Sequence, residues 1–143
     1  MGEGDPGGQY QGGVGHLRVD EPTGKEAGVG ISTTSGSNKP SYTVKDVELV
    51  MAGPQVQART FTLAPGDSIP WHYHSEITDH YFVLRGTLTI KTRDPDSERE
   101  FGIGNRHRIM PGTAHLLSNR GAMDCQFLLL QGVGKYDWIK AEG

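Results

Sequence analysis

The chain has 143 residues, of which 34% are hydrophobic, so its length and composition indicate one domain with a single hydrophobic core. Its formal net charge is −3 at pH 7 with both signs interspersed, which argues against a nucleic-acid or membrane partner. Cys125 is the lone cysteine, which excludes an internal disulfide, and no apolar run reaches the roughly 18–20 residues that a membrane span needs.

The first 40 residues differ in composition from the rest of the chain. They contain eleven glycines and few large apolar side chains, so they can bury little surface to offset the entropy lost on ordering. We therefore expect residues 1–40 to form a glycine-rich N-terminal arm, which is either flexible or lies across a neighbouring subunit. This segment shows no charged stretch followed by an apolar core, so we expect no signal peptide and a cytoplasmic location.

Residues 41–143 are expected to form a single β-barrel domain. Short apolar or alternating segments are separated by Gly, Pro, Asn or Asp, a pattern typical of an all-β sandwich or barrel. Residues 127–130 are apolar on both faces, which predicts a central strand covered from both sides. Residues 136–139 are expected either to pack back on the barrel or to contribute to a subunit contact. The candidate strands are 42–51, 56–63, 81–84, 87–92, 99–103, 106–110 and 126–131.

Two histidines close together in the chain form the first candidate metal-binding motif. His72 and His74 are two residues apart, which in a strand places both side chains on one face, roughly 6–7 Å apart along the backbone. Imidazole nitrogens and carboxylate oxygens both bind zinc and first-row transition metals, so the nearby Asp79 can complete one side of a coordination sphere. His80 is the alternative to Asp79, because adjacent side chains of a strand point to opposite faces.

A third histidine follows a turn farther along the chain. Pro111-Gly112 predicts a tight turn shortly before His115, and Asn119 ends the short apolar run after it. A distant histidine that is placed by a defined turn is what a fourth ligand requires.

These two stretches resemble the paired motifs of the cupin superfamily. The first family motif, G-x5-H-x-H-x3,4-E-x6-G, is matched at Gly66, His72, His74 and Gly86, with Asp79 where the family usually has glutamate. The second, G-x5-P-x-G-x2-H-x3-N, is matched at Gly104, Gly112, His115 and Asn119, with Met110 in place of the first proline.

The resemblance, which covers residues 60–130, implies a small double-stranded β-helix, or jelly-roll barrel, that holds one divalent transition metal inside. It implies His72, His74, Asp79 and His115 as metal ligands, and its spacing favours Asp79 over His80. The mixed ligand set is compatible with iron, manganese, nickel or zinc. The resemblance also implies a homodimer, since single-domain cupins commonly pair their sheets.

The functional hypotheses follow from the ligand number. A metal with three or four protein ligands keeps positions open for water, substrate or dioxygen. Our first hypothesis is a small metal-dependent enzyme of dioxygenase, decarboxylase or isomerase type, acting on a compact oxygen-bearing metabolite. No catalytic acid or base is identifiable apart from the ligands, so the alternative is a non-catalytic barrel that binds or senses a small molecule.

Overall fold

The computed structural model describes residues 15–22 and 40–142 of the chain. Since this part of the chain holds strands and turns but no helix, it contains no helix long and apolar enough to cross a membrane. The strands are β1 (Leu17–Asp20), β2 (Ser41–Val44), β3 (Asp46–Gly53), β4 (Val56–Leu63), β5 (Ser68–Tyr73), β6 (Thr78–Arg85), β7 (Leu88–Thr92), β8 (Ser97–Phe101), β9 (Arg106–Ile109), β10 (His115–Ser118), β11 (Cys125–Gly132) and β12 (Ile139–Lys140).

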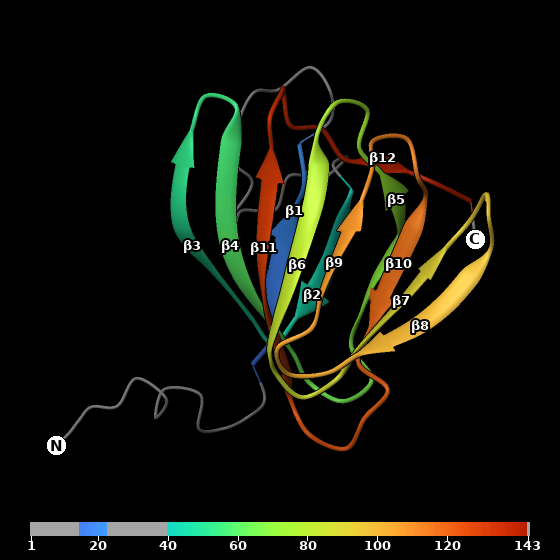
Figure 1. Cartoon of the computed structure of the whole chain (residues 1–143). Coiled ribbons are helices and arrows are strands. Elements are labelled where there is room, and N and C mark those ends of the chain that lie inside the picture. The colour runs from blue at the N-terminus through green and yellow to red at the C-terminus, as the bar shows by residue number, and fades with distance from the viewer. Residues whose placement is uncertain (1–14, 23–39, 143) are drawn as a thin grey trace, which may run out of the picture.

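Two five-stranded antiparallel sheets face each other (Figure 1). One has the order β3-β4-β11-β6-β9 and the other the order β12-β5-β10-β7-β8, while β1 and β2 form a separate two-stranded sheet. The two larger sheets approach each other at the lower end of Figure 1 and diverge towards the upper end. From β4 onward the chain crosses repeatedly between them, which brings side chains from both sheets into one interior. The predicted all-β jelly-roll barrel is confirmed.

The interior is filled by alternate side chains of the strands. In β11, Phe127 and Leu129 are buried between the sheets, and Phe127 stacks on Phe61 of β4 with ring centroids 5.3 Å apart. This strand lies between β4 and β6, as predicted for a central strand. The prediction that both of its faces are covered is wrong, because Leu128 and Leu130 are half-buried on the outer face. An antiparallel sheet needs cover on one face only.

Residues 17–22 depart from the expected division at residue 40. They do not behave as an arm, because β1 pairs along its whole length with β2, from Leu17 opposite Val44 to Asp20 opposite Ser41. Val19 is 1% exposed, so this short piece belongs to the barrel core despite its glycine-rich surroundings. The remainder of the expected arm, residues 1–14 and 23–39, lies outside the described residues.

Candidate metal centre

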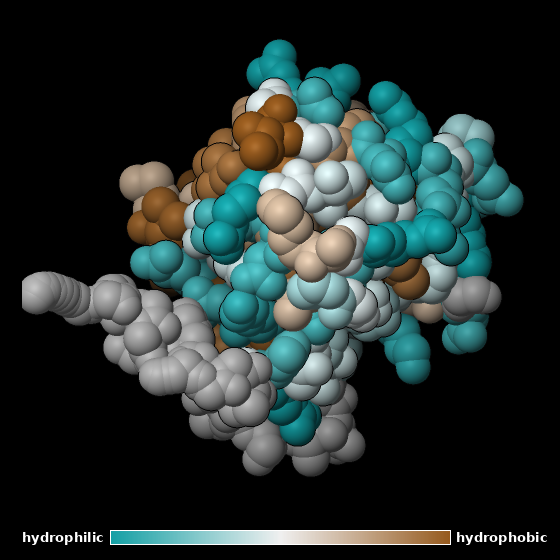
Figure 2. All heavy atoms as spheres, turned by 90° about the horizontal axis from the view of Figure 1, so that it is seen from below, coloured by the Kyte–Doolittle hydropathy of each residue, from teal (hydrophilic) through white to brown (hydrophobic). Residues whose placement is uncertain are grey.

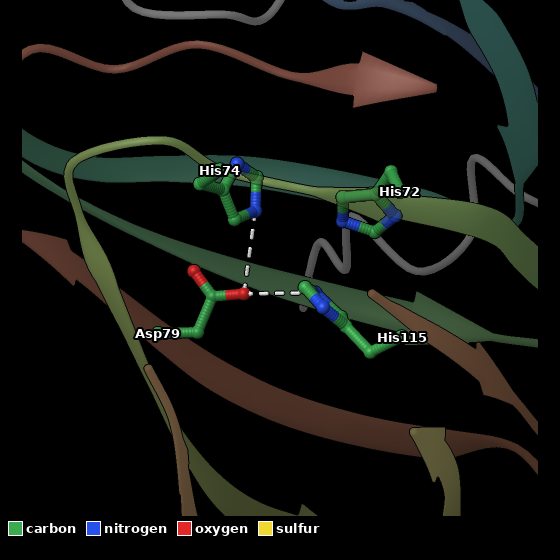
Figure 3. A group of neighbouring side chains, drawn as sticks. All are labelled: His72, His74, Asp79 and His115. Atoms are coloured by element: carbon green, nitrogen blue, oxygen red, sulfur yellow. Dashed lines mark ion pairs between the residues drawn. The ribbon is translucent and has the colours of Figure 1, made fainter. Parts of the chain in front are cut away.

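Four side chains from both large sheets converge inside the barrel (Figure 3). His72 lies in β5, His74 follows directly after it, Asp79 lies in β6 and His115 begins β10. One possible ligand atom of each lies within 4.8 Å of those of the others, and none of the four residues is more than 3% exposed. The structure thus brings together the four residues that the motifs predicted, and their binding of a metal stays a prediction.

Strand pairing and one turn explain why the histidines meet. β5 and β10 are antiparallel neighbours, and His72 is directly opposite His115 in their register. The amide of Gly112 donates a 2.8 Å hydrogen bond to the carbonyl oxygen of His74, which joins the predicted Pro111-Gly112 turn to the first motif. Gly112 has φ = 83°, in the left-handed region that glycine adopts readily. The turn therefore fixes His74 and His115 relative to each other.

Asp79 faces the histidines from the opposite sheet, because β6 and β5 belong to different sheets. Although its side chain is short, its Oδ2 lies 3.3 Å from Nε2 of His74 and 3.1 Å from Nε2 of His115. Its neighbour His80 is half-buried, pairs in register with Leu130 and does not join the cluster. Strand alternation thus brings Asp79, and not His80, to the interior.

Backbone carbonyl groups fix the orientation of the three imidazoles. Each Nδ1 atom donates to such a group, at 2.7 Å for His72 to Pro70, 2.5 Å for His74 to Asp137 and 2.8 Å for His115 to Thr113. Because a carbonyl oxygen can only accept, Nδ1 carries a proton in each ring, and Nε2 remains as the possible ligand atom. Hydrogen bonds of this kind are typical partners of metal-binding histidines.

Within residues 15–22 and 40–142, the buried Nε2 atoms of His74 and His115 lack a hydrogen-bond partner. Both face the same Asp79 oxygen across the ion-pair contacts drawn in Figure 3. Lone pairs on nitrogen and oxygen repel at these distances unless a cation, either a proton or a metal ion, lies between them. Three imidazoles and one carboxylate are ligands that zinc and first-row transition metals accept, so the donor set fits such a metal.

The protonation of the site follows from burial and from these contacts. Burial alone would raise the pKa of Asp79, but His74 and His115 outweigh it and hold that pKa well below its ordinary value. Burial alone would lower the pKa of His74, whereas the Asp79 carboxylate more than reverses this and raises it. For His72, burial followed by repulsion from His115 and His74 keeps the pKa well below its ordinary value. The site therefore favours an ionised carboxylate and a neutral His72, as metal ligation requires, whereas a metal on His74 must displace the proton that Asp79 favours.

Two buried side chains hold the Asp79 carboxylate in place. Nε2 of Gln131 donates to Oδ1 at 2.8 Å, and the Tyr81 hydroxyl donates to Oδ2 at 2.8 Å. Gln131 is opposite Asp79 in the β6–β11 register, and Tyr81 follows Asp79 by two residues on the same face. The motifs identify neither residue. The two-residue spacing between Asp79 and Tyr81 was the only signal in the sequence for this support.

A buried ion pair lies behind Gln131. Nη2 of Arg59 donates to Oε1 of Gln131 at 2.9 Å, and Nη1 lies 3.6 Å from Oε2 of Glu21. The hydroxyls of Tyr42 and Tyr136 both donate to the Glu21 carboxylate. Burial alone would lower the pKa of Arg59, but Glu21, followed by the two tyrosines, raises it. Sequence reasoning missed this network because Glu21 lies within the segment that composition assigned to the arm.

Residues 136–139 pack back on the barrel and cover the histidines, which was one of the two expectations for them. The Trp138 ring stacks on the His72 ring, with centroids 4.5 Å apart and an interplanar angle of 13°. The Tyr136 ring lies 5.4 Å from the His74 ring. Tyr136 and Trp138 are themselves 8% and 3% exposed, so this segment closes the barrel over the candidate ligands.

Other motif residues shape the backbone. Gly86 has φ = 74°, and a Cβ atom there would lie 2.4 Å from the carbonyl oxygen of Asp124. The Asn119 side chain donates 2.8 Å hydrogen bonds to the carbonyl oxygens of Leu63 and Met123. These residues hold turns together and take no part in the ligand cluster.

A barrel of two antiparallel sheets, with three histidines and a carboxylate converging inside it, defines a class of β-barrel proteins with an internal candidate metal centre. The family model for the cupin domain matches residues 59–131, which are 73 of the 143 residues, and the chain belongs to this family.

Solved structures share this fold at low sequence identity. An uncharacterized conserved protein with a double-stranded β-helix domain from Klebsiella pneumoniae is 20% identical with a TM-score of 0.61, over 66% of this chain and 82% of that chain. An RmlC-like cupin family protein with a double-stranded β-helix fold from Methanocaldococcus jannaschii is 21% identical with a TM-score of 0.57, over 62% of this chain and 80% of that chain. KdgF from Halomonas is 16% identical with a TM-score of 0.54, over 59% of this chain and 74% of that chain. These likenesses show the double-stranded β-helix fold. A comparison with curated protein sequences gave no match.

Proposed function

We propose that the protein is a metal-binding cupin in which His72, His74, Asp79 and His115 hold one divalent transition metal. The observation that carries this proposal is the pair of buried Nε2 atoms, of His74 and His115, which face Oδ2 of Asp79 at 3.3 and 3.1 Å and have no hydrogen-bond partner in the described part of the chain. A cation between these atoms removes the repulsion. The ligand set suits iron, manganese, nickel or zinc, and affinity order alone does not select one of them in the cell.

We further propose that the site is that of a small cytoplasmic enzyme acting on a compact oxygen-bearing metabolite, by dioxygenation, decarboxylation or isomerisation. A metal bound there supplies Lewis acidity towards a substrate oxygen. Gln131 and Tyr81 engage both oxygens of Asp79 and so hold this carboxylate in one orientation. Trp138, stacked on His72, excludes bulk water from that side of the cluster.

The enclosure of the cluster favours a second candidate function, a non-catalytic barrel that binds or senses a small molecule. The four residues are between 0% and 3% exposed, and aromatic rings cover His72 and His74. A substrate would reach an ion at this depth only if the covering segment moved. A closed coordination sphere is typical of sites that bind metal for structure and not for turnover.

The metal site is tested by elemental analysis of untagged protein that is purified without chelator or added metal. We expect near-stoichiometric iron, manganese, nickel or zinc in the wild type and its loss in His74→Ala and His115→Ala. The matched control is His80→Ala, because this histidine adjoins Asp79 in sequence but lies outside the cluster. Wild-type protein that carries none of these metals and takes up none of them would contradict the proposal, as would equal loss of metal in His80→Ala.

Turnover distinguishes the enzyme from the binding barrel. Metal-loaded wild type and His115→Ala are compared on small hydroxy acids, enediols and keto acids, which can bind a metal through two oxygen atoms. Conversion by the wild type alone supports the enzyme. Saturable binding by the wild type without conversion of any compound supports the binding or sensing barrel.

We also propose that the protein is a homodimer, with the exposed apolar side chains of β3 in the interface. Residues 136–139, a predicted contributor, instead pack on the chain's own barrel. Leu49, Val50 and Met51 are 44%, 54% and 67% exposed on β3, which is an edge strand. Figure 2 shows apolar surface gathered at the left of the view, the side of β3 and β4 in Figure 1. An apolar edge strand is a surface that a second copy can cover.

Sedimentation at micromolar concentration tests this interface. We expect the wild type to be a dimer and Met51→Lys to shift it towards monomer, because a charge would be buried at the contact. The control is Ile103→Lys, which changes an equally exposed apolar residue in the turn between β8 and β9. A monomeric wild type would contradict the proposal of a dimer.

A further inference from the structure

A cavity of about 270 Å³ lies beside the candidate metal centre. Its walls come from the β3–β4 turn, from Ile77 and Gln57, and from the segment that includes Tyr136. Gln131 also lines it, and none of the four candidate metal ligands does. Because Gln131 donates to Asp79 and the Tyr136 ring lies against His74, these two side chains separate the cavity from the ligand cluster.

A chain of hydrogen bonds fixes which way the amide of Gln57 points. Nε2 of Gln131 donates to Asp79, so Oε1 of Gln131 is the accepting end, and Nη2 of Arg59 donates to that same oxygen. The group of Gln57 that faces Oε1 of Gln131 at 2.8 Å must therefore be its donor, Nε2. Oε1 of Gln57 is then directed away from this chain of hydrogen bonds.

That oxygen has no hydrogen-bond partner among the residues that the structure describes, although Gln57 is only 5% exposed. A buried acceptor without a donor lowers the stability of the fold unless something supplies one. Tyr136, whose ring forms part of the wall, donates its hydroxyl to Glu21 and so does not supply this donor. A molecule bound in the cavity that Gln57 lines can supply the missing donor.

The cavity has the character of a small-molecule site. Val56, Ile77 and the ring of Tyr136 provide apolar walls around the amide of Gln57. Ligand sites combine mostly apolar walls with a few placed polar groups, and their volumes start at about 300 Å³ for drug-sized compounds. A volume of about 270 Å³ is therefore suited to a compact metabolite.

We propose that this cavity is a binding site for a compact hydroxyl-bearing molecule, such as a small polyol or hydroxy acid, whose hydroxyl donates to Oε1 of Gln57. The site is distinct from the ligand cluster and does not depend on a bound metal. Through Gln131, however, its occupant lies one side chain away from Asp79.

The experiment follows the side-chain amide signals of glutamine by ¹H–¹⁵N NMR, in metal-loaded and metal-free protein. Glycerol, erythritol and glycerate are titrated as probes, each beside its fully O-methylated ether, which has no hydroxyl donor. We expect saturable shifts of the Gln57 and Gln131 signals with at least one hydroxyl compound and none with its ether. The separate metal analysis decides the proposed metal function, so the two outcomes are independent.

Two variants and one control test the assignment of the site. Gln57→Met removes the acceptor at similar length and should weaken binding by about tenfold or more. Val56→Phe places a larger side chain in the wall of the cavity. Because Val56 is 48% exposed, this change should leave the fold intact, so it tests the same site even if Gln57→Met folds poorly. Gln126→Met, at the other end of β11 beside Thr62, should leave binding unchanged. The proposal is overturned if no probe gives saturable shifts up to its solubility limit, or if both cavity variants bind as the wild type does.

Discussion

At the scale of single residues, Asp79 is the group on which the candidate metal centre depends most. It supplies the only carboxylate of the four-residue cluster, and both of its oxygens already have partners, Gln131 on Oδ1 and Tyr81 on Oδ2. Aspartate is one methylene shorter than the glutamate usual in the family, yet its Oδ2 reaches both His74 and His115. Its orientation is therefore set by fixed hydrogen bonds and not by side-chain length.

Replacing Gln131 should weaken metal binding without removing a ligand. Gln131→Leu deletes the hydrogen bond to Oδ1 of Asp79, and losing an orienting partner of this kind costs about 10–100-fold in metal affinity. Competition with a chromophoric chelator measures the affinity. Gln126→Leu on the same strand is the control and should bind metal as the wild type does. Unaltered affinity in Gln131→Leu would show that Asp79 needs no such support.

The metal-free protein should lose stability as the pH falls below about 6.5, the ordinary pKa of histidine. Burial, with repulsion from His115 and His74, holds the folded-state pKa of His72 well below that value. In this window a proton binds His72 in the unfolded chain but not in the folded protein. The free energy of unfolding therefore falls by up to about 1.4 kcal/mol per pH unit. His74, whose pKa is raised, is protonated in both states there and adds no slope.

Denaturant unfolding of metal-free protein across this pH window gives the measurement. His72→Leu should show a shallower dependence on pH than the wild type, because it lacks the group that takes up the proton on unfolding. Parallel profiles for the two proteins would mean that His72 is charged in the folded state.

At the scale of elements, β1 contributes to the centre although it lies far from the motifs in sequence. It leads directly into Glu21, which is 0% exposed and accepts hydrogen bonds from Tyr42 and Tyr136. Arg59 connects this carboxylate to Gln131 and thereby to Asp79. A short strand thus anchors the last supporting layer of the site.

Removing one partner of this ion pair should destabilise the protein more than removing both partners. Arg59→Met leaves the Glu21 carboxylate buried without its cation, which costs about 3–5 kcal/mol of unfolding free energy. The double variant Glu21→Gln/Arg59→Met removes both charges and should be more stable than Arg59→Met alone. Urea unfolding of the two variants and the wild type measures this. A double variant that is less stable than Arg59→Met would show that the Glu21 carboxylate, with its two tyrosine hydrogen bonds, stabilises the fold even without Arg59.

The sequence predicted the elements whose signals are local. The spacing of His72 and His74 and the Pro111-Gly112 turn depend on a few consecutive residues, so the fold class and the members of the cluster were predictable. The supporting layer was not, since Tyr136 and Glu21 are 115 positions apart and meet only through the tertiary fold. Composition also gave a wrong prediction for β1. Its four residues have strand character, but the glycine content of the whole segment 1–40 obscured that local signal.

At the scale of the whole molecule, metal binding should appear as stability. The four candidate ligands converge from both sheets only in the folded barrel, so an ion bound there would stabilise that state by about 2.7 kcal/mol when free metal is 100 times its Kd. Thermal unfolding of metal-loaded protein with and without a chelator measures this difference. His74→Ala should be insensitive to the chelator. If neither metal nor chelator changed the melting temperature of the wild type, this would contradict the proposed site.

The stack of Trp138 on His72 gives the barrel an optical reporter of its own. The chain has two tryptophans, and the other, Trp71, packs instead under the guanidinium of Arg93 at 4.2 Å. In Trp71→Phe protein the remaining indole emission comes from a ring in contact with a candidate ligand. Loading with a paramagnetic ion such as manganese should quench that fluorescence, whereas zinc, with its filled d shell, should quench it far less. Occupancy and the kind of ion can then be followed in this single-tryptophan variant without any added dye.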